Sequence, residues 1–185
     1  MIDDVLSDGE DRMKKTVDAV QRELAAIRTG HAHVGLVDHV QVEYYGSLMP
    51  VNQMATVAAP EARLLTIQPW DRSAMTAIEK ALLKSDLGLT PSNDGQIIRL
   101  SIPPLTEARR KDLIKVVHKR IEDGRVAVRN VRRDGVEHLR KLVHDKEISE
   151  DDQRRAQEQL QKLTDRYVAL IDERGKGKEA ELMEV

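Results

Sequence analysis

Arg125-Val-Ala-Val-Arg129-Asn-Val-Arg132-Arg133-Asp134 is a run of ten residues that contains four arginines and lies in a longer stretch with the apolar spacing of an amphipathic helix. At about 100° per residue, Arg125, Arg129 and Arg132 are predicted to share one side of this helix. Val128 and Val131 are predicted to face the other way. The run therefore predicts a packed helix with an arginine stripe, and an ordinary solvated helix face is the alternative interpretation.

The arginine stripe suggests contact with phosphate groups. Arg110 lies several turns earlier, and the same helical arithmetic brings it to within roughly 40° of Arg132. The guanidinium group is planar, stays charged and offers several donors, so it suits a row of phosphate oxygens. Arg110, Arg129 and Arg132 fall within a roughly 100° arc, which makes them the first candidates for binding nucleic acid.

Charge is unevenly distributed along a chain whose net charge is −2. Residues 105–145 carry twelve basic and seven acidic side chains, whereas residues 1–30, 31–104 and 146–185 each carry more acidic than basic ones. A basic element flanked by acidic ones indicates a directed basic face. It also argues against binding of naked duplex DNA, because the acidic neighbours would repel it.

Three long helices are predicted from apolar residues that recur at spacings of three and four. The first ends at Gly30, the second follows Pro103-Pro104-Leu105-Thr106 and continues to about residue 145, and the third begins after Ser149 as N-cap. Gly175 and Gly177 are expected to fray the third helix. The predicted apolar seam of that helix consists of Ala156, Leu160, Leu163, Tyr167 and Leu170. Burial of the three seams against one another predicts an elongated three-helix bundle.

The middle of the chain has a different pattern. Residues 40–44, 54–57, 64–67 and 97–100 read as strands, and residues 73–84 read as a short helix. Residues 90–95, Thr-Pro-Ser-Asn-Asp-Gly, are predicted to form a loop. The fold class is therefore α+β: a bundle formed by residues 1–30 and 105–185, with a small β/α/β domain inserted at residues 31–104. The two connections, at 29–31 and 103–106, are expected to run side by side and act as a hinge.

Composition limits the functional classes. The chain contains no cysteine and no phenylalanine, and its few aromatic residues are scattered, so thiolate chemistry and stacking of single-stranded bases are not expected. The acidic N-terminus lacks the apolar region of a signal peptide, and no stretch has the length of a membrane span. A cytosolic protein that does not contact a membrane is expected.

Six blocks of sequence resemble the bacterial ribosome recycling factor family, in the family's order and across the whole chain. They are Arg28-Thr-Gly, Val42-Glu-Tyr-Tyr-Gly46, Ser85-Asp-Leu-Gly-Leu89, Pro103-Pro-Leu-Thr-Glu-Ala-Arg-Arg-Lys-Asp112, the arginine run at 125–134, and Asp145-Lys-Glu-Ile-Ser-Glu-Asp-Asp152.

The resemblance implies a two-domain, L-shaped protein with a tRNA-like outline. A protein of this kind binds the post-termination 70S ribosome and, with elongation factor G and GTP, splits it into subunits. The resemblance also implies that the bundle contacts large-subunit rRNA through Arg110, Arg129 and Arg132, with Arg125 and Arg133 as auxiliaries. The implied hinge residues are Thr29, Gly30, His31, Pro103 and Pro104.

The chain departs from the family pattern at the first connection. The family usually continues Arg-Thr-Gly with Arg-Ala and then a proline two positions on, whereas this chain has His31-Ala-His33-Val34. The hinge therefore lacks a fixed positive charge and a rigid proline. A metal pair formed by His31 and His33 is an alternative with little support, because no further ligands are evident.

The sequence is compatible with three functional classes to different degrees. A non-enzymatic translation factor without cofactor or metal, acting as a monomer, is the first. An enzyme is the second, but the sequence has no phosphate-cradling glycine loop, no HExxH and no recognisable nucleophile motif. A helical module that pairs with another protein is the third, because long apolar seams permit it.

Overall fold

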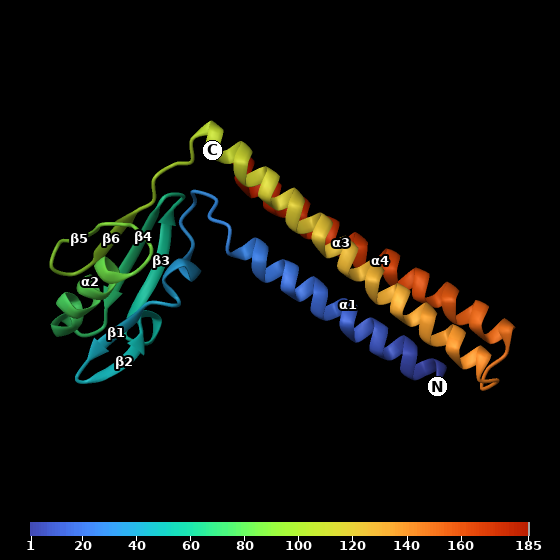
Figure 1. Cartoon of the computed structure of the whole chain (residues 1–185). Coiled ribbons are helices and arrows are strands. Elements are labelled where there is room, and N and C mark those ends of the chain that lie inside the picture. Colours follow the sequence, from blue (N-terminus) through green and yellow to red (C-terminus); the bar gives the residue numbers. More distant parts are fainter. Residues whose placement is uncertain (185) are drawn as a thin grey trace. The chain divides into compact units, whose positions relative to one another are not determined.

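The computed structural model describes residues 1–184 and divides the chain into two compact units, Met1–Arg28 with Glu107–Val185, and Thr29–Thr106. Val185, the last residue of the range predicted for the bundle, lies outside the described residues. The helices and strands, in chain order, are α1 (Ile2–Ala25), β1 (Gln41–Tyr44), β2 (Ser47–Pro50), β3 (Ala55–Glu61), β4 (Leu64–Pro69), α2 (Met75–Lys84), β5 (Pro91–Asn93), β6 (Ile98–Ser101), α3 (Glu107–His144) and α4 (Glu150–Met183), with short 3-10 helices at Val34–Val37, Val51–Gln53 and Arg72–Ala74 (Figure 1).

The first unit is a three-helix bundle, as predicted. α1, α3 and α4 pack against one another along their lengths (Figure 1). α3 runs antiparallel to α1, because Arg12 pairs with Asp134 at 2.9 Å and Glu23 pairs with Arg120 at 3.6 Å. The buried residues are those of the apolar seams, among them Met13, Val17, Leu24, Val117, Val128, Leu139, Leu160 and Ile171.

The helix ends show how local sequence sets the bundle. α4 begins with a capping box, in which the Ser149 hydroxyl accepts from the Asp152 N–H at 3.0 Å and the Asp152 carboxylate accepts from the Ser149 N–H at 3.3 Å. The hydrogen bond with Ser149 lowers the pKa of Asp152. α1, predicted to end at Gly30, ends at Ala25 instead. The Ile27 N–H bonds to the Leu24 carbonyl at 3.1 Å, and this i to i−3 bond tightens the last turn.

The seam predicted for α4 was wrong at two positions. Leu163 and Leu170 are only partly buried, whereas Thr164 and Ile171 are buried. Thr164 is tolerated there because its hydroxyl donates to the Leu160 carbonyl at 2.8 Å. The buried side of α4 therefore includes a polar residue, Thr164, which a search for apolar residues alone does not find.

The prediction that Gly175 and Gly177 fray α4 was also wrong, since the helix continues to Met183. Gly175 is buried, and a Cβ built on it would lie 2.6 Å from Ile121 Cγ1. A Cβ on Gly124 would lie 2.7 Å from Val20 Cγ2. These two glycines permit close approach of the helices.

The second unit contains two sheets around one apolar core. β1 and β2 form an antiparallel hairpin, and a four-stranded sheet has the order β3-β4-β6-β5 (Figure 1). The core includes Val42 of the hairpin, Ile78 of α2, and Ile67 and Ile98 of the larger sheet. The predicted β/α/β domain is therefore confirmed.

Residues 90–95, predicted to be a loop, contain the short strand β5, which pairs antiparallel with β6. β5 is an edge strand, so Pro91 can begin it without breaking a ladder on both sides. β2 was not predicted as a strand either. It pairs with β1 in register Tyr44↔Ser47 across the two-residue turn.

Among the described residues, no helix is both long enough and apolar enough to cross a membrane.

Candidate nucleic-acid interface

The arginines of α3 flank its buried seam and do not oppose it. Val128 is fully buried, and Val131 is buried as well. Arg132 lies four residues after Val128, which places the two side chains about 40° apart around the helix. The prediction that Val128 faces away from the arginines was therefore wrong, whereas Val131 lies about 100° or more from each of Arg125, Arg129 and Arg132. Arg132 lies next to the packing contact with α4.

Arg125 is engaged by carboxylates of the bundle. Its Nε donates to Asp172 Oδ1 of α4 at 2.7 Å, and its Nη1 donates to Glu122 Oε2 at 3.1 Å. The hydrogen bond with Asp172 raises the pKa of Arg125 above its ordinary value. With both carboxylates already bound, this side chain connects α3 to α4, and its donors are less available to a phosphate.

Arg132 is held by an uncharged partner. Its Nη1 donates to Gln161 Oε1 of α4 at 2.6 Å, and Gln161 Nε2 donates in turn to Asp165 Oδ1 at 2.8 Å. The amide orients the guanidinium group without neutralising its charge. The remaining Arg132 donors are therefore held in position for an anion.

Arg132 and Arg133 line a cavity of about 480 Å³ between α3 and α4. Arg140 lies on the same wall, and the cavity is otherwise lined by Val136, Glu137, Gln157 and Gln161. Three arginines face one carboxylate among the described lining residues. Such a cavity favours an anionic ligand.

Arg129 and Arg110 lie outside this cavity. Arg129 is exposed and makes a long ion pair of 3.9 Å with Glu122. Arg110 lies about 28 Å from Arg129 along α3, at 1.5 Å per residue. Its Nε is buried without a hydrogen-bond partner among the described residues. The structure therefore brings together Arg129, Arg132 and Arg133 but places Arg110 at a second point along the helix.

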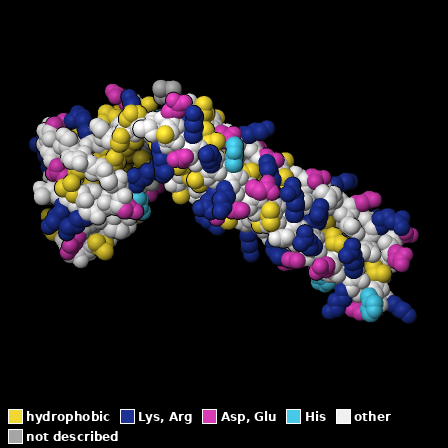
Figure 2. All heavy atoms as spheres, turned by 45° about the horizontal axis from the view of Figure 1, so that its top comes forward, with side chains coloured by type: hydrophobic (Ala, Val, Ile, Leu, Met, Phe, Trp, Pro, Cys, Tyr) yellow, Lys and Arg dark blue, Asp and Glu magenta, His cyan; other side chains and the backbone are white. Residues whose placement is uncertain are grey.

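The basic side chains follow the exposed surface of the helical unit. Figure 2 shows Lys and Arg side chains close together along this unit, interrupted by Asp and Glu side chains. Cations distributed along the helical unit in this way suit a polyanion.

Arg140 and Gln161 were missed by the sequence analysis. Arg140 lies seven residues after Arg133, about two helical turns, so extension of the arginine spacing beyond residue 134 was a signal for it. Gln161 belongs to another helix and carries no such signal. Only the packing of α4 on α3 brings it to Arg132.

The predicted hinge residues lie where the chain enters and leaves the inserted unit. Gly30 has φ +77°, and a Cβ built on it would lie 3.0 Å from Leu105 Cγ, so the two connections are in contact there. Nearby, the Ala32 N–H donates to the Ala62 carbonyl at 2.6 Å, and the Ile102 N–H donates to the Arg63 carbonyl at 2.8 Å. Both connections are thus anchored on the β3–β4 turn.

The histidines of the first connection have local roles. His33 Nδ1 accepts from the Gly35 N–H at 3.0 Å and caps the 3-10 helix Val34–Val37. His31 Nδ1 lies 3.3 Å from Thr29 Oγ1. Among the residues that the structure describes, no three or more His, Asp or Glu side chains are grouped to hold a metal ion.

Changing Gln161 to Glu is expected to weaken binding of the ribosome, the partner that the family resemblance implies, by about 1 kcal/mol, because a carboxylate beside Arg132 would pair with it and repel phosphate. Binding of fluorescently labelled protein to 70S ribosomes at several salt concentrations measures this effect. Gln159→Glu is the matched control, since it adds the same charge to α4 at an exposed position two residues away. Equal affinities of the two variants would contradict the assigned role of Gln161.

Known proteins are similar to this chain in sequence over its whole length. The family model described as "Ribosome recycling factor" matches residues 20–183. The ribosome-recycling factor of Solidesulfovibrio magneticus is 58% identical over 98% of each chain, and that of Nitratidesulfovibrio vulgaris is 56% identical over 100% of this chain and 99% of its own.

Solved structures are similar over the whole chain. The solution structure of a ribosome recycling factor has a TM-score of 0.81 and 44% identity, covering 100% of this chain and 98% of the other. A second structure, of the T. thermophilus ribosome recycling factor with E. coli elongation factor G bound to the E. coli post-termination complex, has a TM-score of 0.66 and 44% identity, and each chain is covered completely. Sequence, fold and the arginine-lined helix lead to one conclusion: this chain belongs to the ribosome recycling factor family.

Proposed function

We propose that this protein is a translation factor that binds the post-termination 70S ribosome and, together with elongation factor G and GTP, separates it into subunits in the bacterial cytoplasm. Family membership supports the proposal, as does the similar structure whose protein is bound with elongation factor G to the post-termination complex. The observation that carries it in this chain is the set of arginines along α3, three of which line one cavity.

In this proposal Arg110, Arg129 and Arg132 bind phosphates of large-subunit rRNA, and Arg133 and Arg140 assist them. Arg132 is supported by its neutral partner Gln161, which leaves its charge available. Arg110 lies on the same helix, and its assignment rests on the family resemblance. Arg125, first assigned as an auxiliary, is assigned instead to holding α3 against α4 through Asp172.

The protein acts mechanically in this proposal and is not an enzyme. GTP is bound by elongation factor G and not by this protein. This protein transmits the push of elongation factor G through its inserted unit to separate the ribosomal subunits. The inserted unit turns about the connections at 29–31 and 103–106. Two observations support this motion. The inserted unit is compact, and both connections are bound to the same β3–β4 turn, so the chain enters and leaves the unit at one place.

Gly30→Ala is expected to reduce subunit splitting several-fold while ribosome binding persists. A non-glycine residue at φ +77° costs about 1–2 kcal/mol, and its Cβ would press on Leu105, so the first connection must change its path. Gly88→Ala is the matched control, because Gly88 also has positive φ but has nothing within 4 Å of the added Cβ. Splitting at the wild-type rate by Gly30→Ala, with unchanged binding, would show that this connection is not the hinge.

The alternative of a helical pairing module is less well supported. Its motivation was the long apolar seams, and the structure buries these seams among α1, α3 and α4. An elongated monomer on size-exclusion chromatography is expected.

The decisive test is light scattering of post-termination 70S ribosomes mixed with this protein, elongation factor G and GTP. Scattering should fall with the wild-type protein and stay constant when Arg110, Arg129 and Arg132 are all changed to Ala. No fall with the wild-type protein would contradict the proposed activity. An equal fall with both proteins would retain the activity but remove the arginines from it.

A further inference from the structure

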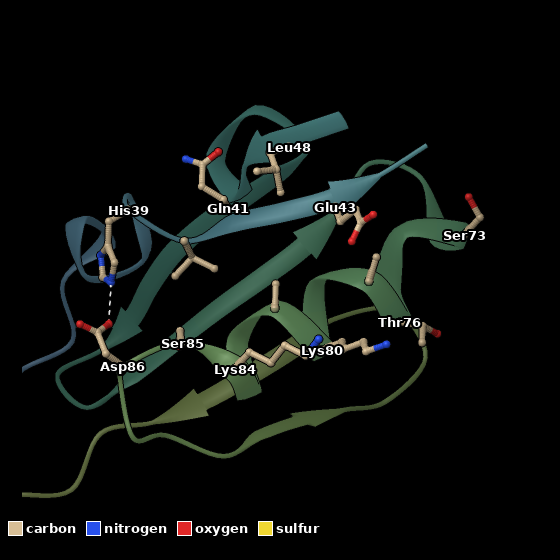
Figure 3. A pocket seen from close by; sticks show the side chains of 13 residues that line it. His39, Gln41, Glu43, Leu48, Ser73, Thr76, Lys80, Lys84, Ser85 and Asp86 are labelled. Atoms are coloured by element: carbon tan, nitrogen blue, oxygen red, sulfur yellow. Dashed lines mark hydrogen bonds and ion pairs between the residues drawn. The ribbon is translucent and has the colours of Figure 1, made fainter. Parts of the chain in front are cut away.

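The inserted unit contains a groove that the proposed function does not use. It has a volume of about 680 Å³ and lies between the β1–β2 hairpin and α2. Figure 3 shows Lys80 and Lys84 extending from α2 on one side, with Glu43 and Leu48 on the hairpin side. His39 and Asp86, 3.0 Å apart, form one end of the groove (Figure 3).

One wall of the groove is the unpaired edge of β1. Val42 and Tyr44 direct their backbone groups to the opposite strand, as the register Tyr44↔Ser47 across the two-residue turn shows. The Val40 carbonyl also faces that strand and accepts from the Val51 N–H at 3.2 Å. The alternation of an antiparallel ladder then directs the N–H and C=O groups of Gln41 and Glu43 outward. No hydrogen bond of these backbone groups to another described residue is found.

The two edges of the hairpin differ. Pro50 lies opposite Gln41, in a pair whose backbone groups point outward, so the outer edge of β2 lacks a donor there. Proline on an edge is a common means of preventing strand addition. The β1 edge has no such block, and Gln41 and Glu43, both lining the groove, retain their N–H groups.

The other wall is a small apolar surface bordered by two lysines. Two acids, Glu43 and Asp86, also line the groove, and Asp86 pairs with His39. Ala77 and Ala81 line the groove between Thr76, Lys80 and Lys84 on α2. Both lysines are exposed, and neither forms an ion pair with an acid in the described part of the chain. Lys80 and Lys84 are about 6 Å apart along the helix axis. Alternate side chains on an extended strand are about 6.8 Å apart, so two acids separated by one residue match this lysine pair.

We propose that this groove binds an extended, acidic peptide segment of a partner protein, which adds as a strand to the free edge of β1 and pairs its carboxylates with Lys80 and Lys84. An added strand supplies donors and acceptors alternately, and this is what an open edge requires. A phosphate backbone offers acceptors only and would leave the carbonyl groups of Gln41 and Glu43 unpaired. The small residues Ala77 and Ala81 leave room beside β1 for the peptide backbone.

The test uses the full-length protein and a capped nonapeptide of alternating glutamate and valine. Fluorescence anisotropy should show saturable binding, and amide exchange should slow at least tenfold at Gln41 and Glu43 when the peptide is bound. Lys80→Glu with Lys84→Glu should weaken binding at least tenfold. Lys115→Glu with Lys119→Glu, an exposed lysine pair with the same spacing on α3, should leave it unchanged.

Two probes separate strand addition from charge attraction alone. The same peptide with N-methyl groups on alternate backbone nitrogens keeps its charge but loses donors, and it should bind at least tenfold more weakly. An oligouridylate should bind this groove more weakly than the acidic peptide. Binding of the N-methylated peptide at full affinity, unchanged exchange at Gln41 and Glu43, or preference of the groove for the oligonucleotide would each overturn the proposal.

Discussion

Changing both Arg129 and Arg132 to Ala should weaken ribosome binding strongly, with each substitution costing about 1–3 kcal/mol if each side chain contacts a phosphate directly. The Arg132→Ala substitution removes a guanidinium group that Gln161 orients at 2.6 Å, and Arg129→Ala removes an exposed cation about one turn earlier. The loss should diminish at high salt, because the slope of log affinity against log salt concentration falls by about one for each phosphate contact removed.

Affinity measured with fluorescent protein over a series of salt concentrations tests this result. Arg154→Ala with Arg155→Ala is the matched control, since it removes the same charge from exposed arginines of α4 that pair with Asp151 and Asp152. An affinity that stays at the wild-type value across the salt series would remove the phosphate contacts from Arg129 and Arg132. An equal loss in the control would reduce the effect to net charge.

Two glycines of α4 should respond in opposite directions to alanine. Gly177→Ala is expected to raise the free energy of unfolding by about 0.5–1 kcal/mol, through helix propensity, because its Cβ would meet nothing within 4 Å. Gly175→Ala is expected to lower it, because the Cβ would lie 2.6 Å from Ile121 Cγ1. Overpacking of a core costs about 1–3 kcal/mol, which exceeds the gain in propensity.

Urea denaturation followed by circular dichroism at 222 nm measures both changes. The two positions lie in the same helix two residues apart, so each serves as the control for the other. Stabilisation by Gly175→Ala equal to that by Gly177→Ala would contradict the close contact between α3 and α4.

The long helices could be predicted from the sequence because their signals are local. The spacing of apolar residues and the Ser149 cap predicted α3 nearly to its ends and the start of α4, whereas the C-terminal end of α4 was predicted too early. β5 was missed because a three-residue edge strand that begins at Pro91 has the composition of a loop. It pairs with β6 across a short turn, and β6 is in turn paired with β4, a strand about 30 residues earlier in the chain.

The candidate site was predicted only in part. Arg129, Arg132 and Arg133 were found because they are close together in one helix. The sequence did not predict that Arg125 pairs with a carboxylate while Arg132 pairs with an amide. Their partners, Asp172 and Gln161, both belong to α4. Spacing within α3 carries no information on which of its arginines meets a carboxylate.

The sequence by itself determined the bundle, the β/α/β insertion and the basic helix, since helical periodicity, strand alternation and caps are properties of neighbouring residues. Tertiary structure decided which glycines allow close helix packing, which arginine keeps its charge available, and which edge of the β1–β2 hairpin stays open. These properties depend on side chains and strands brought together from distant parts of the chain, as Ile121 is to Gly175 and Gln161 to Arg132.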